Sequence, residues 1–143
     1  MPSISEFKCN KCNFALNEGS GGYCYVINDN GKRMPCRHPM EFYDLENVLG
    51  SIYTIEELNE RTGYISECIC LDCLCQFRAD VGEITWNIFA MKVKHSGIPL
   101  KQRDGRKCPR CGSKNVKAET EMVDEPCPKC KVGVIEETVI GWS

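Results

Sequence analysis

The sequence predicts a small, mainly β protein with one or two short helices, built from two metal-stabilised modules. Three observations predict it. The chain is 143 residues long, its apolar residues are spread over many short segments, and twelve of its residues are cysteines. Chains that cannot bury a large apolar core are commonly stabilised by metals or disulfides. We expect metal to supply that stability here.

Eight of the cysteines form four Cys-x2-Cys pairs. A two-residue gap lets two thiolates of one tight turn face the same ion, and two such turns complete a tetrahedral four-cysteine site. Four pairs therefore predict two sites and two zinc ions, with iron as the alternative metal for the same geometry. The predicted ligands are Cys9, Cys12, Cys70, Cys73, Cys108, Cys111, Cys127 and Cys130.

The C-terminal third has the clearest spacing. Its two pairs, at Cys108 and Cys127, are separated by a gap typical of a single zinc site. Residues 115–123 are polar and β-compatible, and residues 132–142 are rich in Val, Ile and Thr, which predicts one or two strands. We therefore expect this module to hold one ion with its own four cysteines.

The turn Cys108-Pro109-Arg110-Cys111-Gly112 resembles the knuckle of the zinc-ribbon and rubredoxin-like superfamily. Gly112 suits the left-handed conformation that follows the second cysteine, since it has no Cβ. The other turn of this module departs from the pattern, because Lys131 stands at the glycine position. The resemblance implies two zinc-ribbon-like modules and metal binding, and no particular activity.

The N-terminal module is expected to pair Cys9 and Cys12 with Cys70 and Cys73 across an insertion, residues 13–69. Asn13 is expected in a left-handed turn, because Asn adopts that conformation readily, whereas Leu74 fits it poorly. The predicted domains are therefore an N-terminal module of residues 1–95, a basic linker of residues 96–106 and a C-terminal ribbon of residues 107–143.

The insertion has its own predicted elements. Residues 23–27 form a strand, 28–31 a turn and 32–34 the returning strand. Thr54 and Glu57 form a capping box that begins a helix, which we expect to end near Thr62 with Gly63 as its stop signal.

Three further elements are predicted outside these. Residues 41–49, before Gly50, predict a second short helix. Residues 75–79 and 84–93 predict strands, because their β-branched and aromatic residues favour extended structure.

The remaining cysteines and one histidine leave two interpretations open. Free cysteines are commonly small buried apolar residues. Alternatively, they complete a third site or replace a paired ligand, because Cys36 lies close to His38 in sequence and two others flank the pair at Cys70. The candidate third-site or alternative ligands are Cys24, Cys36, His38, Cys68 and Cys75.

The charge is uneven along a chain of net charge −2. Residues 92–117 hold nine Lys or Arg residues and one acid, Asp104. Cations in such a segment neutralise phosphates with little sequence preference, or balance the negative charge of the cysteine sites. The candidate nucleic-acid-binding residues are Lys92, Lys94, Lys101, Arg103, Arg106, Lys107, Arg110 and Lys114.

These features predict a non-catalytic zinc-binding protein that acts as a nucleic-acid-associated or adaptor module. Its partners would be nucleic acid or a nucleic-acid-handling complex, with a protein partner on the acidic N-terminal region. A closed four-cysteine site offers no open coordination position, so an enzyme is not expected. The alternatives are a rubredoxin-like iron electron-transfer protein and a thiol or zinc redox sensor.

The expected location is the cytoplasm, with no membrane association. Residues 1–6 lack a basic segment followed by an apolar one, and no apolar run approaches the roughly 20 residues of a membrane span. Cytosolic thiols stay reduced, which favours metal ligands over disulfides.

Overall fold

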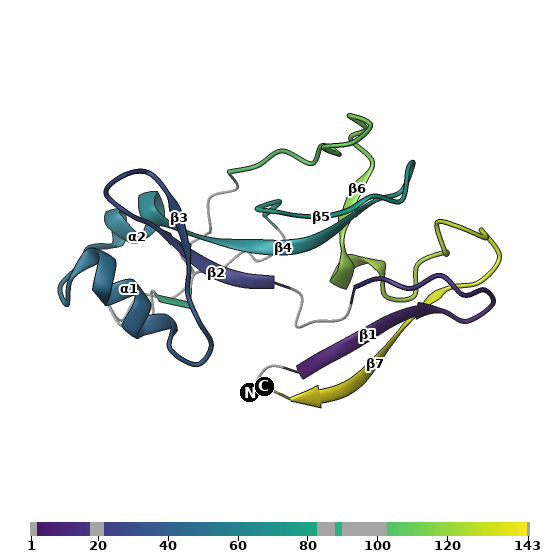
Figure 1. Ribbon diagram of the computed structural model, residues 1–143, viewed down its shortest axis with the longest axis horizontal. Coiled ribbons are helices and arrows are strands. Elements are labelled where there is room, and N and C mark those ends of the chain that lie inside the picture. The colour runs from purple at the N-terminus through teal and green to yellow at the C-terminus, as the bar shows by residue number, and fades with distance from the viewer. Residues whose placement is uncertain (1–2, 18–21, 83–87, 90–102, 143) are drawn as a thin grey trace. The chain divides into compact units, whose positions relative to one another are not determined.

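The computed structural model describes residues 3–17, 22–82, 88–89 and 103–142 (Figure 1). The chain divides into two compact units, each built from separate segments. Unit 1 comprises residues 1–22, 66–79 and 105–143, and unit 2 comprises residues 23–65 and 80–104. These units differ from the expected modules, because unit 1 combines both ends of the chain with a middle segment.

The predicted fold class is confirmed: the protein is small and mainly β, with two short α-helices among the described residues. In unit 1, β1 (Ser3–Cys9) pairs antiparallel with β7 (Ile135–Trp142), as Figure 1 shows. The last part of β4 (Thr62–Cys70) pairs antiparallel with β5 (Gln76–Ala79) and with β6 (Val116–Ala118). A 3-10 helix, η2 (Glu119–Met122), follows β6.

The sequence pattern did not predict β1, although its burial alternates as a half-buried strand requires. Ser5, Phe7 and Cys9 are buried and the residues between them are more exposed. Phe7 packs with Ile69, Met122 and Ile135 in the core of unit 1. The core therefore brings together residues from the first, middle and last segments of the chain.

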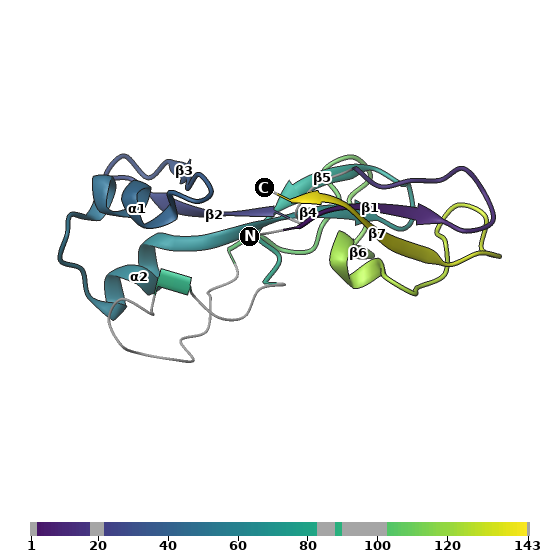
Figure 2. The ribbon, with the colours of Figure 1, turned by 90° about the horizontal axis from the view of Figure 1, so that it is seen from below.

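Unit 2 contains β2 (Gly22–Ile27), β3 (Arg33–Pro35), α1 (Glu41–Leu49), α2 (Ile55–Arg61) and the start of β4 (Figure 2). β3 pairs with β2, and β2 pairs with β4. Val26, Leu45 and Leu58 are fully buried and join the sheet to both helices. The predicted hairpin and both predicted helices are present.

The start of α2 agrees with prediction, and its end has a different cause. Thr54 Oγ1 accepts from the Glu57 N–H at 3.2 Å, which completes the capping box. The chain then leaves the helix in an extended conformation at Thr62, so Gly63 is not a left-handed stop. Gly63 is needed instead for space, because a Cβ there would overlap the Tyr25 hydroxyl.

The strand predicted at residues 84–93 lies largely outside the described residues. Ile88 and Phe89, its described members, lie in a 3-10 turn. In the part of the chain that the structure describes, none of the helices combines the length and the apolar character that a membrane crossing requires.

Candidate metal centres

The eight predicted ligands gather into two groups, and each group draws on both early and late parts of the chain. Centre 1 consists of Cys9, Cys12, Cys127 and Cys130, and centre 2 of Cys70, Cys73, Cys108 and Cys111. Within each group the sulfur atoms all lie within 4.8 Å of one another. Both groups can hold a metal ion.

The predicted pairing of the turns is therefore wrong. The two C-terminal turns do not share an ion, and the turn at Cys9 does not pair with the turn at Cys70. The first turn pairs with the last, and the second pairs with the third, so centre 2 is nested inside the chain segment that centre 1 closes. The physical reason is strand pairing: β1 pairs with β7, and β4 pairs with β6.

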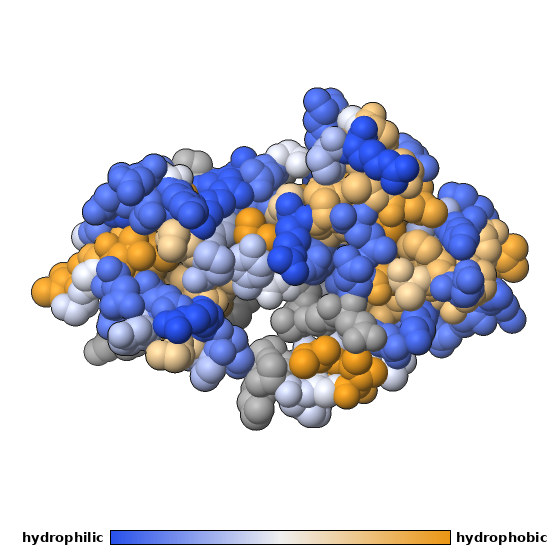
Figure 3. Space-filling view, viewed as in Figure 1, coloured by the Kyte–Doolittle hydropathy of each residue, from blue (hydrophilic) through white to orange (hydrophobic). Residues whose placement is uncertain are grey.

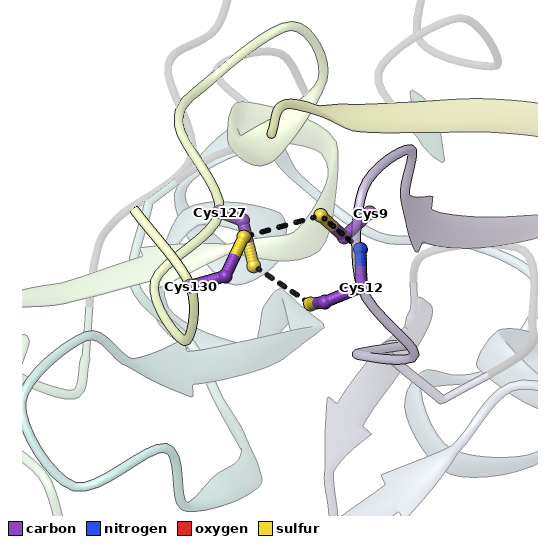
Figure 4. Close-up of side chains that lie close together, drawn as sticks. All are labelled: Cys9, Cys12, Cys127 and Cys130. Atoms are coloured by element: carbon purple, nitrogen blue, oxygen red, sulfur yellow. Dashed lines mark hydrogen bonds between the residues drawn. The ribbon is translucent and has the colours of Figure 1, made fainter. Parts of the chain in front are cut away.

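The sulfur atoms of centre 1 turn toward one another from two separate turns (Figure 4). Cys9 Sγ lies 3.7 Å from Cys130 Sγ, and Cys12 Sγ lies 3.8 Å from Cys127 Sγ. In centre 2, Cys70 Sγ lies 3.6 Å from Cys111 Sγ, and Cys73 Sγ lies 3.5 Å from Cys108 Sγ.

These separations fit a set of metal ligands and not a pair of disulfides. A disulfide joins its sulfur atoms at about 2.05 Å. A tetrahedral ion with metal–sulfur bonds of about 2.3 Å separates its ligands by roughly 3.8 Å. All twelve cysteines are free thiols, and the spacing within both centres is close to that of the tetrahedral ion.

Backbone N–H groups of the turns point at the sulfur atoms. In centre 1, Lys11 N–H donates to Cys9 Sγ at 3.3 Å and Lys129 N–H donates to Cys127 Sγ at 3.4 Å. In centre 2, Arg110 N–H donates to Cys108 Sγ at 3.4 Å. Such donors stabilise the thiolate form that a metal requires.

Three of the four turns place the residue after the second cysteine in the left-handed region. Leu74, Gly112 and Lys131 have φ values of 66°, 78° and 65°. Gly112 was expected there, while the other two adopt the conformation despite their side chains. The expectation for Asn13 is wrong, because it has no positive φ and its Oδ1 instead accepts from Lys129 Nζ at 3.3 Å.

The two centres are built on the same backbone plan. In centre 1, the N–H after the first cysteine, that of Asn10, donates to Val134 O at 3.1 Å. In centre 2 the corresponding Leu71 N–H donates to Asn115 O at 2.9 Å. The strand registers correspond as well, since Cys9 pairs with Ile135 as Cys70 pairs with Val116.

Side chains that the sequence analysis did not single out join the turns of each centre. Val134 N–H donates to Asn10 Oδ1 at 3.1 Å in centre 1. In centre 2, Asp72 accepts from Ser113 Oγ and, at 3.3 Å, from Asn115 Nδ2. The sequence signal for these contacts was the presence of short polar residues inside or just after the turns.

Gly133 has a role that the spacing of the cysteines alone could not reveal. A Cβ at this position would lie 2.6 Å from Cys9 Sγ and 2.8 Å from Lys11 Cβ. The glycine therefore allows the last turn to approach the first.

Each centre contains one thiol that ionises readily. The N–H groups of Gly133 and Val132 lower the pKa of Cys130 to about 6. Burial raises the pKa of Cys108, but the N–H groups of Cys111 and Arg110 outweigh it and lower that pKa to about 6.

Other thiols resist ionisation beside them. The Phe14 N–H lowers the pKa of Cys12, but burial and the three neighbouring sulfur atoms raise it to about 11. The Ser113 N–H likewise lowers the pKa of Cys111, but burial and the neighbouring sulfur atoms raise that pKa to about 12. Metal binding must displace these protons, so affinity for the ion rises with pH.

The five candidate extra ligands do not join a third group among the described residues. His38 Nδ1 lies 3.1 Å from Glu41 Oε1. Cys36 is buried in the core of unit 2, and Cys24 packs against it. Burial is the main reason that the pKa of each of these two thiols is raised to about 12. Cys68 is buried in unit 1.

The candidate nucleic-acid-binding residues separate into three sets. Lys92, Lys94 and Lys101 lie outside the described residues. Arg103 donates to Thr62 O at 2.6 Å and Asn59 O at 2.9 Å, and Arg106 pairs with Glu121 at 2.7 Å. Both arginines therefore have structural partners. The third set, Lys107, Arg110 and Lys114, is exposed beside centre 2.

Comparisons with protein-family models, with curated proteins and with solved structures each found no match to this chain. The two cysteine groups are compatible with zinc-ribbon-like sites. Metal binding therefore rests on the geometry of this chain alone.

Proposed function

We propose that the protein is a non-catalytic zinc-binding scaffold that contacts the phosphate backbone of nucleic acid through the turn of centre 2. The supporting observation is a basic cluster of three exposed residues, Lys107, Arg110 and Lys114, here called the centre 2 cations. No salt bridge involves them among the described residues. Cations without protein partners are available to neutralise phosphates.

The metal would position these cations. Arg110 lies between the two ligands of its turn, and Lys107 and Lys114 flank that turn. Cys108 N–H donates to Ser113 O at 2.8 Å, which closes the turn and fixes the path of the chain between the flanking lysines. A bound ion would hold this geometry together, so the three cations would lose their fixed arrangement if the metal were lost.

The competing explanation is local charge balance. Four thiolates on a divalent ion carry a net charge of −2, which nearby cations offset. The exposed cations on the turns of centre 1, Lys11, Lys129 and Lys131, provide a matched set for comparison. Local balance predicts that neither set affects nucleic-acid binding.

The test is the salt dependence of binding of the zinc-loaded chain to duplex DNA and duplex RNA. Replacement of the three centre 2 cations by Gln should weaken binding across sequences. On DNA it should reduce the slope of log affinity against log salt by roughly 2–3, about 0.9 for each phosphate that is no longer neutralised. The same replacement of the centre 1 set should have a smaller effect. Equal effects, or no binding at low salt, would reject the proposal.

The choice of zinc is tested separately. Sulfur geometry is shared by zinc and iron, so elemental analysis of protein purified without chelators must distinguish them. Two zinc ions per chain are expected. Iron in both centres would favour the electron-transfer alternative.

An adaptor role is the second candidate, and a specific observation favours it. The C-terminal half of β7 exposes Val139, Ile140 and Trp142 by 48%, 47% and 66%. Figure 3 shows an apolar patch over this end of the β1–β7 pair. Beyond β1, no described strand pairs with β7, and a free strand edge can accept an added strand.

The adaptor role predicts that Ile140→Lys abolishes a protein complex that forms at this edge, while Glu136→Lys, at an exposed position near the start of the strand, weakens it less. Cross-linking of the chain in its source cells, followed by identification of the partner, would measure this. The predicted partner of the acidic N-terminal region and the cytoplasmic location also stay predictions.

A further inference from the structure

Glu119 is a buried acid outside both metal centres. It is the first residue of η2 and is only 1% exposed. Neither carboxylate oxygen has a hydrogen-bond partner among the described residues. A buried carboxylate without a partner strongly disfavours its ionised form.

The register of β6 and β4 places a second acid opposite Glu119. Ala118, the last residue of β6, pairs with Cys68 of β4. The residue after it, Glu119, therefore lies across from Glu67. Glu67 pairs with Arg78 of β5, whose Nε donates to Glu67 Oε1 at 2.6 Å. The nearest charge on β4 is therefore negative, and the cation of β5 is already paired with it.

The other charged groups near η2 also have partners. Arg106 donates to Glu121 at 2.7 Å, and Glu121 accepts from the Ala118 N–H at 2.8 Å. Lys117 lies 3.8 Å from Glu125. No described cation therefore faces Glu119 to stabilise its ionised form.

We propose that Glu119 is a proton-dependent latch that holds η2 and β6 against β4. The protonated carboxyl stays in the core of unit 1. The ionised carboxylate favours states in which η2 has opened and the side chain reaches water. This inference is independent of the nucleic-acid proposal, because it concerns the segment that joins the two centres.

The effect of opening this latch follows from its position between the two centres. Residues 112–126 connect the third turn, which belongs to centre 2, to the fourth turn, which belongs to centre 1. β6 and η2 lie within this connection, and Met122 of η2 packs in the core of unit 1. Opening there would loosen the link between the centres without removing a ligand from either.

The direction of the pH effect follows from the titration of the acid. Burial, and then the charge of Glu67, raise the pKa of Glu119 from its ordinary 4.5 to about 7. The folded chain therefore keeps this proton at pH values where the unfolded chain has lost it. The stability that the proton contributes is complete below pH 4.5 and is lost as pH rises through about 7.

The test compares the wild type with Glu119→Gln, a neutral side chain of the same shape, in the zinc-loaded full chain. Amide hydrogen exchange of residues 116–122 is measured at pH 6 and pH 8 and corrected for intrinsic exchange rates. Between pH 6 and pH 8, the equilibrium constant for opening should increase roughly 10-fold more in the wild type than in the variant. Because both proteins share the pH dependence of their metal centres, the ratio isolates Glu119.

Two further variants and one NMR titration support the comparison. Glu136→Gln, an exposed substitution on β7, should behave as the wild type, while Glu67→Gln should move the transition to lower pH. Carbon NMR of the wild type should show the Glu119 carboxyl titrating near pH 7. A titration near pH 4.5, or a wild-type to Glu119→Gln ratio that is equal at both pH values, would overturn the proposal.

Discussion

The two metal centres have the same hydrogen-bond plan and strand register but differ in how the rest of unit 1 covers them. In centre 1, every ligand is at least partly buried, and the strand that follows it, β7, extends over eight residues. In centre 2, Cys111 is exposed and the following strand, β6, has only three residues. The paired turns therefore specify the ligand geometry, while the flanking strands determine how far solvent reaches it.

The largest expected effect breaks the more buried centre. Cys127 is fully buried, so Cys127→Ser should release the ion of centre 1 and strongly destabilise the β1–β7 pair, because structural zinc contributes about 10–16 kcal/mol of apparent binding free energy. Cys111→Ser should be milder, since water can reach the exposed position and complete the coordination. Metal content and chelator competition measure both. Retention of two ions by Cys127→Ser would contradict the assignment.

The next effect concerns the approach of the two turns in centre 1. Gly133→Ala should destabilise unit 1 by about 1–3 kcal/mol and weaken metal binding, because the added Cβ meets Cys9 Sγ. Gly112→Ala in centre 2 should cost roughly 1–2 kcal/mol through its left-handed φ alone.

Chemical denaturation of the metal-loaded protein provides the measurement for these glycine variants. Gly105→Ala is the matched control, since nothing lies within 4 Å of an added Cβ there. Equal costs at positions 105 and 133 would show that the turns of centre 1 do not approach each other this closely.

The smallest effect tests the left-handed residue that follows each second cysteine. Lys131→Gly should stabilise the protein by about 0.5–1 kcal/mol, because φ is 65° and the side chain is exposed. Leu74→Gly should gain less or lose stability, since Leu74 packs against the core of unit 1. Thermal unfolding of the two variants compares them directly. A loss of stability in Lys131→Gly would show that its side chain stabilises the fold by more than its backbone conformation costs.

The ligands themselves could be predicted from sequence because Cys-x2-Cys spacing is a local property. The hairpin at Asn28–Gly31 and the capping box at Thr54 were predictable for the same reason. In each case a few adjacent residues determine the geometry through their own hydrogen bonds, such as the Asn28 Oδ1 that accepts from Asn30 and Lys32 N–H.

The pairing of the turns could not be predicted, because it depends on packing between distant segments. Separation along the chain favoured Cys108 with Cys127, but β1 pairs with β7 and buries Phe7 and Ile135 in one core. The available signals were the alternation of buried residues before Cys9 and the glycine at 133. Each gains its meaning only once the partner segment is known.

The structural roles of the arginines also could not be predicted from the charge pattern. Arg103 belongs to the basic segment by sequence, yet its guanidinium donates to Tyr25 Oη and to two backbone carbonyls of unit 2. Composition shows where cations are concentrated. It does not show which of them already have partners.

The nested pairing of the four turns can be tested by the metal content of two double variants. Cys9→Ser/Cys127→Ser removes two ligands from one centre, so one ion per chain should remain in centre 2. Cys9→Ser/Cys70→Ser removes one ligand from each centre and should weaken or abolish both. If the turns paired with their neighbours in sequence, the first variant would damage both sites and the second would retain one intact. That reversed pattern would contradict the nested pairing.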